Sequence, residues 1–189
     1  EAGLARALSA LFGWDIPLLT LAEIAQRAEH HFVGVQCGIM DMYASLFGRK
    51  NQLIQLDCRT QTHEYIPFDL SDYVLILANS GVKHSLAESA YNARRASCEE
   101  GVRYFQSMDA SIQSLRDITS DFFQTHASFL SEEVRKRCLY VIEEQARVLD
   151  VVEALKNNDL QKVGLLMYQT HQGLSELYEV SCDEIDFLV

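Results

Sequence analysis

This 189-residue chain lacks an excess of basic residues, long apolar runs and internal repeats, and each absence argues against a class of protein. Basic residues are few, since 16 lysines and arginines stand against 27 acidic residues, which gives a net charge of −11. This charge argues against a nucleic-acid partner, because phosphate binding depends on basic side chains. No apolar run approaches the roughly 20 residues of a membrane-spanning helix, so we expect no membrane partner. An internal repeat or low-complexity tract is also absent.

The five cysteines lack the spacing of a disulfide framework. They are odd in number, widely separated, and include no C-x-x-C pair: Cys37, Cys58, Cys98, Cys138 and Cys182. This pattern is typical of reduced thiols, and it predicts a cytoplasmic protein.

Two short motifs of metal and phosphate binding are absent as well. The run Glu29-His30-His31 lacks the i,i+4 histidine spacing of a zinc-binding helix, so we expect no metal ligands in this chain. Gly34 and Gly38 do not form a Walker A loop, because no Gly-Lys-Ser/Thr follows them.

The apolar pattern predicts an α+β fold. Residues 52–57 and 62–68 are typical of two strands joined by a polar turn, as in a hairpin. The continuous apolar run over residues 73–78 predicts a third, buried strand. The chain is predicted to be almost entirely helical after about residue 107.

Helices are predicted from apolar spacing and from capping residues. The predicted helices cover residues 4–12, 20–31 behind a Thr20 capping box, 40–47, 86–107, a long stretch beginning at Ser131, 160–171, and a last helix behind a capping box at Ser181.

One segment combines glycines with a single carboxylate. Residues 33–41 read Val-Gly-Val-Gln-Cys-Gly-Ile-Met-Asp, and two glycines four residues apart let the backbone bend close to a ligand. Asp41 lies in an otherwise apolar stretch, where a carboxylate is costly to bury without a partner. The pattern alone allows two interpretations: Asp41 caps a helix, or it is a functional carboxylate.

Three segments carry a resemblance when they are considered together. They are VGVQCGIMDMYASLFG over 33–48, NSGVKHSLAESAYNARR over 79–95 followed by Cys98-Glu99, and a stretch from Met167 through His171 to Asp186 that ends in YEVSCDEID. In this order they resemble the galactokinase family of the GHMP small-molecule kinases, whose typical forms are VGVxCGIMDQF, NSxVxHxLAxSxYNxRRxxCE and YEVSCxELD. The first two motifs are specific, and the three span nearly the whole chain.

The resemblance implies a two-lobed fold with the active site between the lobes. Residues 1–50 would form part of the N-terminal GHMP kinase lobe, and residues 51–189 part of the C-terminal lobe. The implied reaction transfers a phosphoryl group from ATP, with Mg²⁺, to the anomeric hydroxyl of galactose.

The resemblance also implies roles for three residues. Asp41 matches the family's catalytic base, which orients the sugar hydroxyl and accepts its proton. The backbone of Gly38 would lie at the sugar, where a side chain would collide. Tyr91 would hydrogen-bond the sugar, although without the family it is better interpreted as an aromatic residue packed on a helix face. Arg94 and Arg95 are expected to pair with Glu88, Glu99 or nearby backbone, and His84 receives no role.

The chain departs from the family pattern in two ways. Met42 stands where the family usually has Gln, which removes an amide beside the base and bears on sugar specificity. The family motifs GRVNLIGEHTDY, GLSSSA and GGGFGG are not present, so the nucleotide-binding residues are unknown. The chain is expected to begin just after the serine loop and to stop before the last motif, and we expect these 189 residues alone to be inactive.

Three alternatives remain beside a galactokinase. The protein could be a kinase for N-acetylgalactosamine, which differs in the room around the sugar C2 position. It could be a galactokinase-like sugar sensor that binds ATP and galactose to regulate a protein partner. It could also be an unrelated α+β domain.

Overall fold

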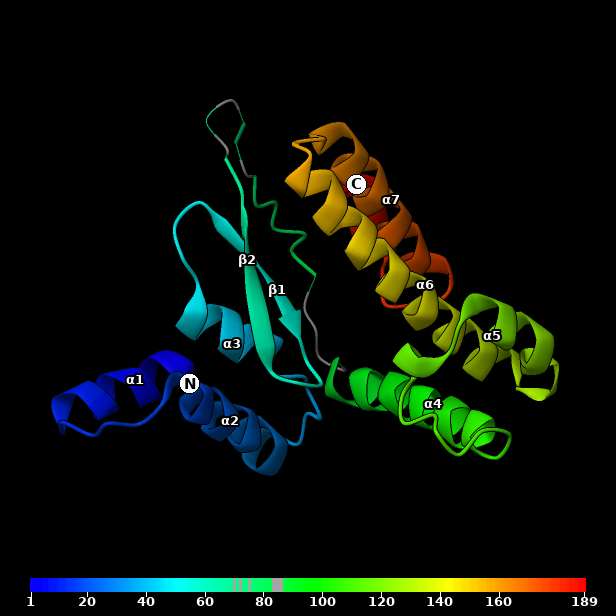
Figure 1. The fold of residues 1–189 in the computed structure, drawn as a ribbon, viewed down its shortest axis with the longest axis horizontal. Coiled ribbons are helices and arrows are strands. Elements are labelled where there is room, and N and C mark those ends of the chain that lie inside the picture. The colour runs from blue at the N-terminus through cyan, green and yellow to red at the C-terminus, as the bar shows by residue number, and fades with distance from the viewer. Residues whose placement is uncertain (70, 72, 75, 83–86) are drawn as a thin grey trace. The chain divides into compact units, whose positions relative to one another are not determined.

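The computed structural model describes residues 1–69, 71, 73, 74, 76–82 and 87–189 (Figure 1). The chain divides into two compact units, residues 1–75 and residues 76–189. The first unit combines helices with a two-stranded antiparallel sheet, and the described part of the second unit has helices and no strand. This helix-rich chain with one small sheet confirms the predicted α+β class.

The helices of the first unit pack around α2. This unit contains α1 (Ala2–Leu11), α2 (Leu18–Ala28), the π-helical turn η1 (Glu29–Val33) and α3 (Met40–Phe47). Leu21, Ala22 and Ala25 of α2 are buried, and the two alanines allow the neighbouring helices to approach closely. The predicted capping box at Thr20 is wrong. Pro17, whose fixed φ suits the entry to a helix, precedes an α2 that begins two residues before Thr20.

The hairpin has the predicted position. Strands β1 (Gln52–Asp57) and β2 (Thr62–Pro67) pair antiparallel, with Leu53 opposite Ile66. The turn is closed by Asp57, whose Oδ1 accepts from the backbone N–H groups of Arg59 at 2.9 Å and Thr60 at 3.2 Å. A short polar side chain that satisfies the turn's own backbone explains why this turn could be predicted from sequence.

The predicted strand over residues 73–78 is wrong at the residues that the structure describes there. Residues 73, 74 and 76–78 are not in a strand, and Ile76 and Leu77 are 82% and 99% exposed. A strand needs a partner for its backbone groups. β1 and β2 pair with each other, and the described residues offer no third strand.

The second unit is a bundle of helices. Its elements are α4 (Ala87–Gln106), η2 (Leu115–Asp117), α5 (Ser120–His126), η3 (Ala127–Phe129), α6 (Glu132–Lys156), α7 (Leu160–Glu176) and α8 (Asp183–Leu188). The prediction of helix after residue 107 is confirmed. Its core comes from α4, α5, α6 and the turns between them: Phe105, Ile112, Leu115, Ile118, Phe123, Ala127, Val134, Cys138 and Ile142.

Two of its predicted helix starts are confirmed and one is wrong. The side chain of Ser131 accepts from Val134 N–H at 3.3 Å, and that of Asp159 accepts from Lys162 N–H at 3.0 Å. The capping box at Ser181 does not form. Cys182 is the N-cap of α8, and the Ser181 hydroxyl instead donates to the carboxylate of Asp186 at 2.6 Å.

Candidate functional site

Helix α3 is held against the hairpin by aromatic side chains. Tyr43 is 2% exposed, stacks on Phe47 one turn later at 4.2 Å, and hydrogen-bonds His63 Nδ1 on β2 at 2.6 Å. Tyr65 of β2 donates its hydroxyl to the carbonyl of Phe47 at 2.7 Å, and the Arg49 guanidinium lies 4.0 Å above the Tyr65 ring. These contacts fix the orientation of α3 around its own axis.

Asp41 lies on the opposite face of α3 from these anchors. It precedes Tyr43 by two residues, which is a rotation of about 200° around a helix. Its side chain is exposed, and no described residue forms a hydrogen bond or ion pair with it. The capping interpretation is wrong, because Ile39 is the N-cap and Asp41 is in the first turn. There the carboxylate is favoured by the helix dipole and is left accessible to a ligand.

The loop before α3 is held at both ends, at Gly34 by a backbone hydrogen bond and at Ile39 by burial. At its start, Gly34 has a φ of 87° and its N–H closes the π turn on the carbonyl of Glu29 at 2.9 Å. A residue with a Cβ would be strained in this left-handed conformation. At its end, Ile39 is 4% exposed.

Between these two points the loop leaves Gly38 open. Apart from atoms of Gly38 itself and its two chain neighbours, no described heavy atom lies within 4 Å of a Cβ built on Gly38. The chain itself therefore has room for a side chain at this position.

The Cys37 thiol of the same loop has a different environment. Burial, followed by the charge of Glu29, raises the pKa of Cys37. The thiol is thus held in its protonated form at neutral pH, where it is a poor nucleophile.

Two side chains that the sequence analysis did not single out as site residues contact this loop. Gln26 Nε2 lies 3.1 Å from the carbonyl oxygen of Cys37, and His30 Nε2 lies 2.8 Å from the same atom. In the sequence, His30 is part of a Glu-His-His run that lacks the spacing of zinc ligands. The signal for its contact with the loop is the spacing of four residues, which places Gln26 and His30 on one face of the helix leading into the loop.

Tyr91 lies in the second unit, in α4, with its side chain 45% exposed. Beside it, Arg94 donates to the backbone carbonyls of Tyr178 at 2.7 Å and Glu179 at 2.9 Å. Arg95 pairs with Glu99 at 2.9 Å. The expectation that the two arginines bind a carboxylate or nearby backbone is thus confirmed. Lys83 and His84 of the same motif lie outside the described residues.

The YEVSC segment after α7 is tied to two other helices. The guanidinium of Arg137 on α6, which is 2% exposed, binds the carbonyl of Leu177 and the carboxylate of Glu179. The hydrogen bond from Arg137, then its charge, lowers the pKa of Glu179. Burial, aided by Cys98 and Tyr91, raises the pKa of Tyr178, so its phenol stays protonated. The segment is therefore a structural junction of α4, α6 and α7.

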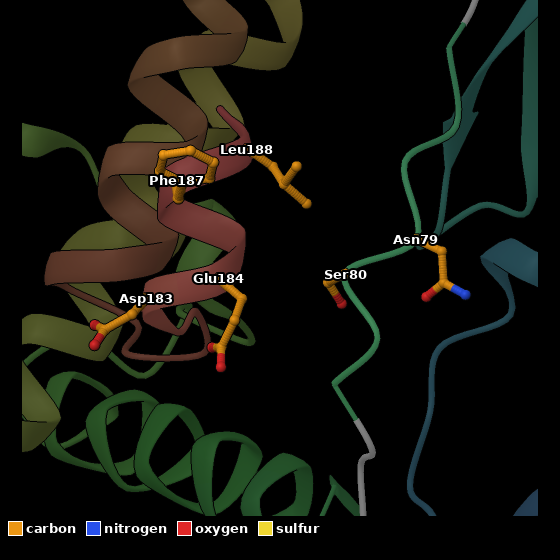
Figure 2. Close-up of a pocket in the computed structure, with 6 residues that line it drawn as sticks. All are labelled: Asn79, Ser80, Asp183, Glu184, Phe187 and Leu188. Atoms are coloured by element: carbon orange, nitrogen blue, oxygen red, sulfur yellow. The ribbon is translucent and has the colours of Figure 1, made fainter.

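The second unit also contains a pocket of about 420 Å³ (Figure 2). Asn79 and Ser80 line one side, and residues of α8 line the other: Asp183, Glu184, Phe187 and Leu188. None of the predicted site residues lines it. Its charged side chains are both carboxylates, which does not favour a phosphate ligand.

Comparison with known proteins agrees with the motifs. Residues 1–49 match the family model for the GHMP kinases N terminal domain. A galactokinase from Thermotoga maritima is 43% identical over all 189 residues, which are 51% of that protein, and one from Thermosipho africanus is 38% identical with the same coverage. The crystal structure of Lactococcus lactis galactokinase complexed with galactose matches with a TM-score of 0.93 and 32% identity, over the whole chain and 48% of that structure.

The chain is similar to galactokinases over its whole length, in both sequence and fold. It spans about half the length of the curated relatives that it matches. The alternative of an unrelated α+β domain is excluded, because both the sequence and the fold match over the whole chain. Among the described residues, no helix is long and apolar enough to cross a membrane.

Proposed function

We propose that the full-length protein containing this chain phosphorylates galactose at its anomeric hydroxyl with ATP. The observation that carries this proposal is the match of the entire chain to galactokinases, one of them solved with galactose. The chemistry of Asp41 also supports it, because its exposed carboxylate binds no described residue and lies on a helix that Tyr43 and Tyr65 anchor to the hairpin.

Asp41 acts as the base in this proposal. The anomeric hydroxyl forms a bond to the γ-phosphorus as the bond from phosphorus to the β-phosphate oxygen breaks, and the hydroxyl proton passes to the Asp41 carboxylate. A carboxylate is a weak base, but a loose transition state for phosphoryl transfer requires proton removal only late. Its main contribution is to hold the hydroxyl in line for attack.

Gly38 and Tyr91 contact the sugar in this proposal. The open space at Gly38 supports a close approach of the sugar to the loop backbone, since no part of the described chain occupies it. The half-exposed Tyr91 phenol supports a hydrogen bond to a sugar hydroxyl.

The phosphoryl donor is proposed to be ATP with Mg²⁺. Among the described residues there is no group of three or more His, Cys, Asp or Glu side chains that could hold a metal ion. We therefore assign no magnesium ligands to the described residues.

We also propose that residues 1–50 belong to the N-terminal lobe of the kinase and residues 51–189 to its C-terminal lobe. The extent of the family match, residues 1–49, supports this boundary. The hairpin after residue 50 packs on α3 within the first compact unit, so the lobes and the packing units need not coincide. The five widely spaced cysteines, which include no C-x-x-C pair, support a reducing location such as the cytoplasm.

The test is ATP-dependent phosphorylation by the full-length protein, with galactose compared to N-acetylgalactosamine. Wild type, Asp41→Asn and the control Asp15→Asn are measured, since Asp15 is an exposed carboxylate of the same unit. We expect turnover on galactose that falls at least about 100-fold in Asp41→Asn, with an unchanged Tm, and is retained in the control.

The other outcomes identify the alternatives. Faster turnover on N-acetylgalactosamine would make the protein a kinase for that sugar. Galactose binding without turnover in the wild type would make it a sugar sensor.

A further inference from the structure

The carbonyl oxygen of Cys37 is contacted by two side chains from the preceding helical segment. Gln26 Nε2 lies at 3.1 Å and His30 Nε2 at 2.8 Å. A carbonyl only accepts hydrogen bonds, and its two lone pairs can take both donors. The His30 contact therefore requires a proton on Nε2, which both the Nε2–H tautomer and the imidazolium carry.

The π turn at the end of α2 helps to place His30. Residues Glu29–Val33 form i,i+5 hydrogen bonds, and the turn closes through Gly34 N–H on Glu29. Such a turn widens the helix locally and redirects its side chains, and π turns are frequent at functional sites. The turn and the left-handed Gly34 bring the chain back so that Cys37 faces Gln26 and His30.

The contacted carbonyl belongs to the peptide that joins Cys37 to Gly38. This peptide is planar, so holding its oxygen also fixes the N–H of Gly38. Gly38 has no Cβ to restrict its backbone, and beyond its chain neighbours no described atom lies within 4 Å of the place where a Cβ would be. Ile39, buried, and Asp41, in the first turn of α3, follow directly.

We propose that Gln26 and His30 are positioning residues of the active site. Their two hydrogen bonds hold the Cys37–Gly38 peptide, and through it they set the backbone that approaches the sugar and the entry into the turn that carries Asp41. This inference rests on the proposed function, because the loop positions a substrate only if the protein binds one.

The experiment removes each donor from the full-length protein. The variants are Gln26→Leu, His30→Leu, the double variant, and His30→Gln, which restores a nitrogen donor close to the position of Nε2. His31→Leu is the matched control, since His31 is the neighbouring residue in the same turn and is exposed. For each variant we measure kcat and KM for galactose, the Tm, and amide hydrogen exchange in residues 34–42.

We expect kcat/KM for galactose to fall about 10-fold in each single Leu variant and about 100-fold in the double variant, as a misplaced catalytic group does. His30→Gln should recover to within about 3-fold of wild type, and His31→Leu should match wild type. Exchange should rise in residues 34–42 of the Leu variants while the Tm stays close to that of wild type.

Two results would overturn the inference. Unchanged kinetics in the double variant would show that the two donors do not position the site. An activity loss that follows a fall in Tm, and that His30→Gln does not rescue, would show a merely structural role. If the wild type does not phosphorylate galactose, the proposed function fails, and the exchange data still decide whether the donors hold the loop.

Discussion

Gly38 faces open space on a loop whose two ends, at Gly34 and Ile39, are fixed. Its own chain sets no steric demand for glycine there, because no described atom lies within 4 Å of the missing Cβ and its φ is not left-handed. A requirement for glycine at this position would therefore arise from a ligand and not from folding.

This distinction gives a prediction for Gly38→Ala in the full-length protein. We expect KM for galactose to rise about 10-fold or more, the scale on which one methyl group disturbs a fitted site, while the Tm stays unchanged. Gly3→Ala is the control, since its Cβ also meets no described atom and it lies on α1 of the same unit. An unchanged KM together with an unchanged Tm would remove Gly38 from the sugar site.

Single residues show clearly what the sequence could and could not predict about the site. Asp41 was predicted because its motif is local and specific, and its exposed position opposite the aromatic anchors agrees with a functional carboxylate. The roles of Asp41, Gly38 and Tyr91 stay predictions. The contacts of Gln26 and His30 could not be predicted, because the turn geometry that brings them to Cys37 has no strong signature in the sequence.

At the scale of elements, α6 and α7 cross closely at one glycine. A Cβ on Gly173 of α7 would lie 2.7 and 2.9 Å from two ring carbons of Tyr140 on α6. The Tyr140 ring is 8% exposed and is backed by Tyr178 at 4.9 Å, so it has little room to move.

We therefore predict that Gly173→Ala destabilises the full-length protein by about 1–3 kcal/mol, the usual effect of overpacking. The measurement is urea unfolding of the variant beside Gly164→Ala. Gly164 lies on the same helix and its Cβ would meet no described atom. Equal effects of the two substitutions, or a more stable Gly173→Ala, would contradict this account of the crossing.

Helices and strands were predicted correctly where the sequence signal lies within a few residues of the element that it starts or ends. Helix α3 and the hairpin were confirmed because Gly48 and the turn at Asp57 lie within a few residues of the elements that they end. The strand predicted over residues 73–78 is wrong at the described residues of that range, because an apolar composition favours a strand but does not provide a partner strand.

At the scale of the whole molecule, the chain carries a net charge of −11. Two of its carboxylates, Glu179 and Asp186, form hydrogen bonds and ion pairs within the fold. The pKa of Glu179 is lowered by the hydrogen bond from Arg137 and then by the charge of Arg137. The pKa of Asp186 is lowered chiefly by the hydroxyl of Ser181, with Ser175 and His171 contributing. These two carboxylates tie the last segment of the chain to α6 and α7.

This arrangement predicts an acid-sensitive stability. Because both pKa values are lower in the folded state, the stabilisation is complete above the ordinary values of 4.5 and 3.8 and is lost as the pH falls through the folded values. The double variant Glu179→Gln/Asp186→Asn should therefore have a lower Tm than wild type at pH 7, and the difference should shrink below about pH 4.5.

The measurement is the Tm from pH 3 to pH 7 in the full-length protein. Glu100→Gln/Asp150→Asn is the control, since both of these carboxylates are exposed on α4 and α6. A difference between wild type and the Glu179/Asp186 double variant that grows toward acid pH would contradict the assignment of these bonds.

The sequence by itself determined the α+β class, most helices, the hairpin and the family motifs. These depend on signals within a few residues of one another, such as the cap at Ser131, the stop at Gly48 and the run around Asp41. Only the tertiary structure decided that the Arg137 guanidinium is buried beneath Glu179, that the Cys37 carbonyl receives two donors, and that residues 76–78 stay exposed. Burial and long-range hydrogen bonds depend on which surfaces meet after folding, and no short stretch of sequence contains that information.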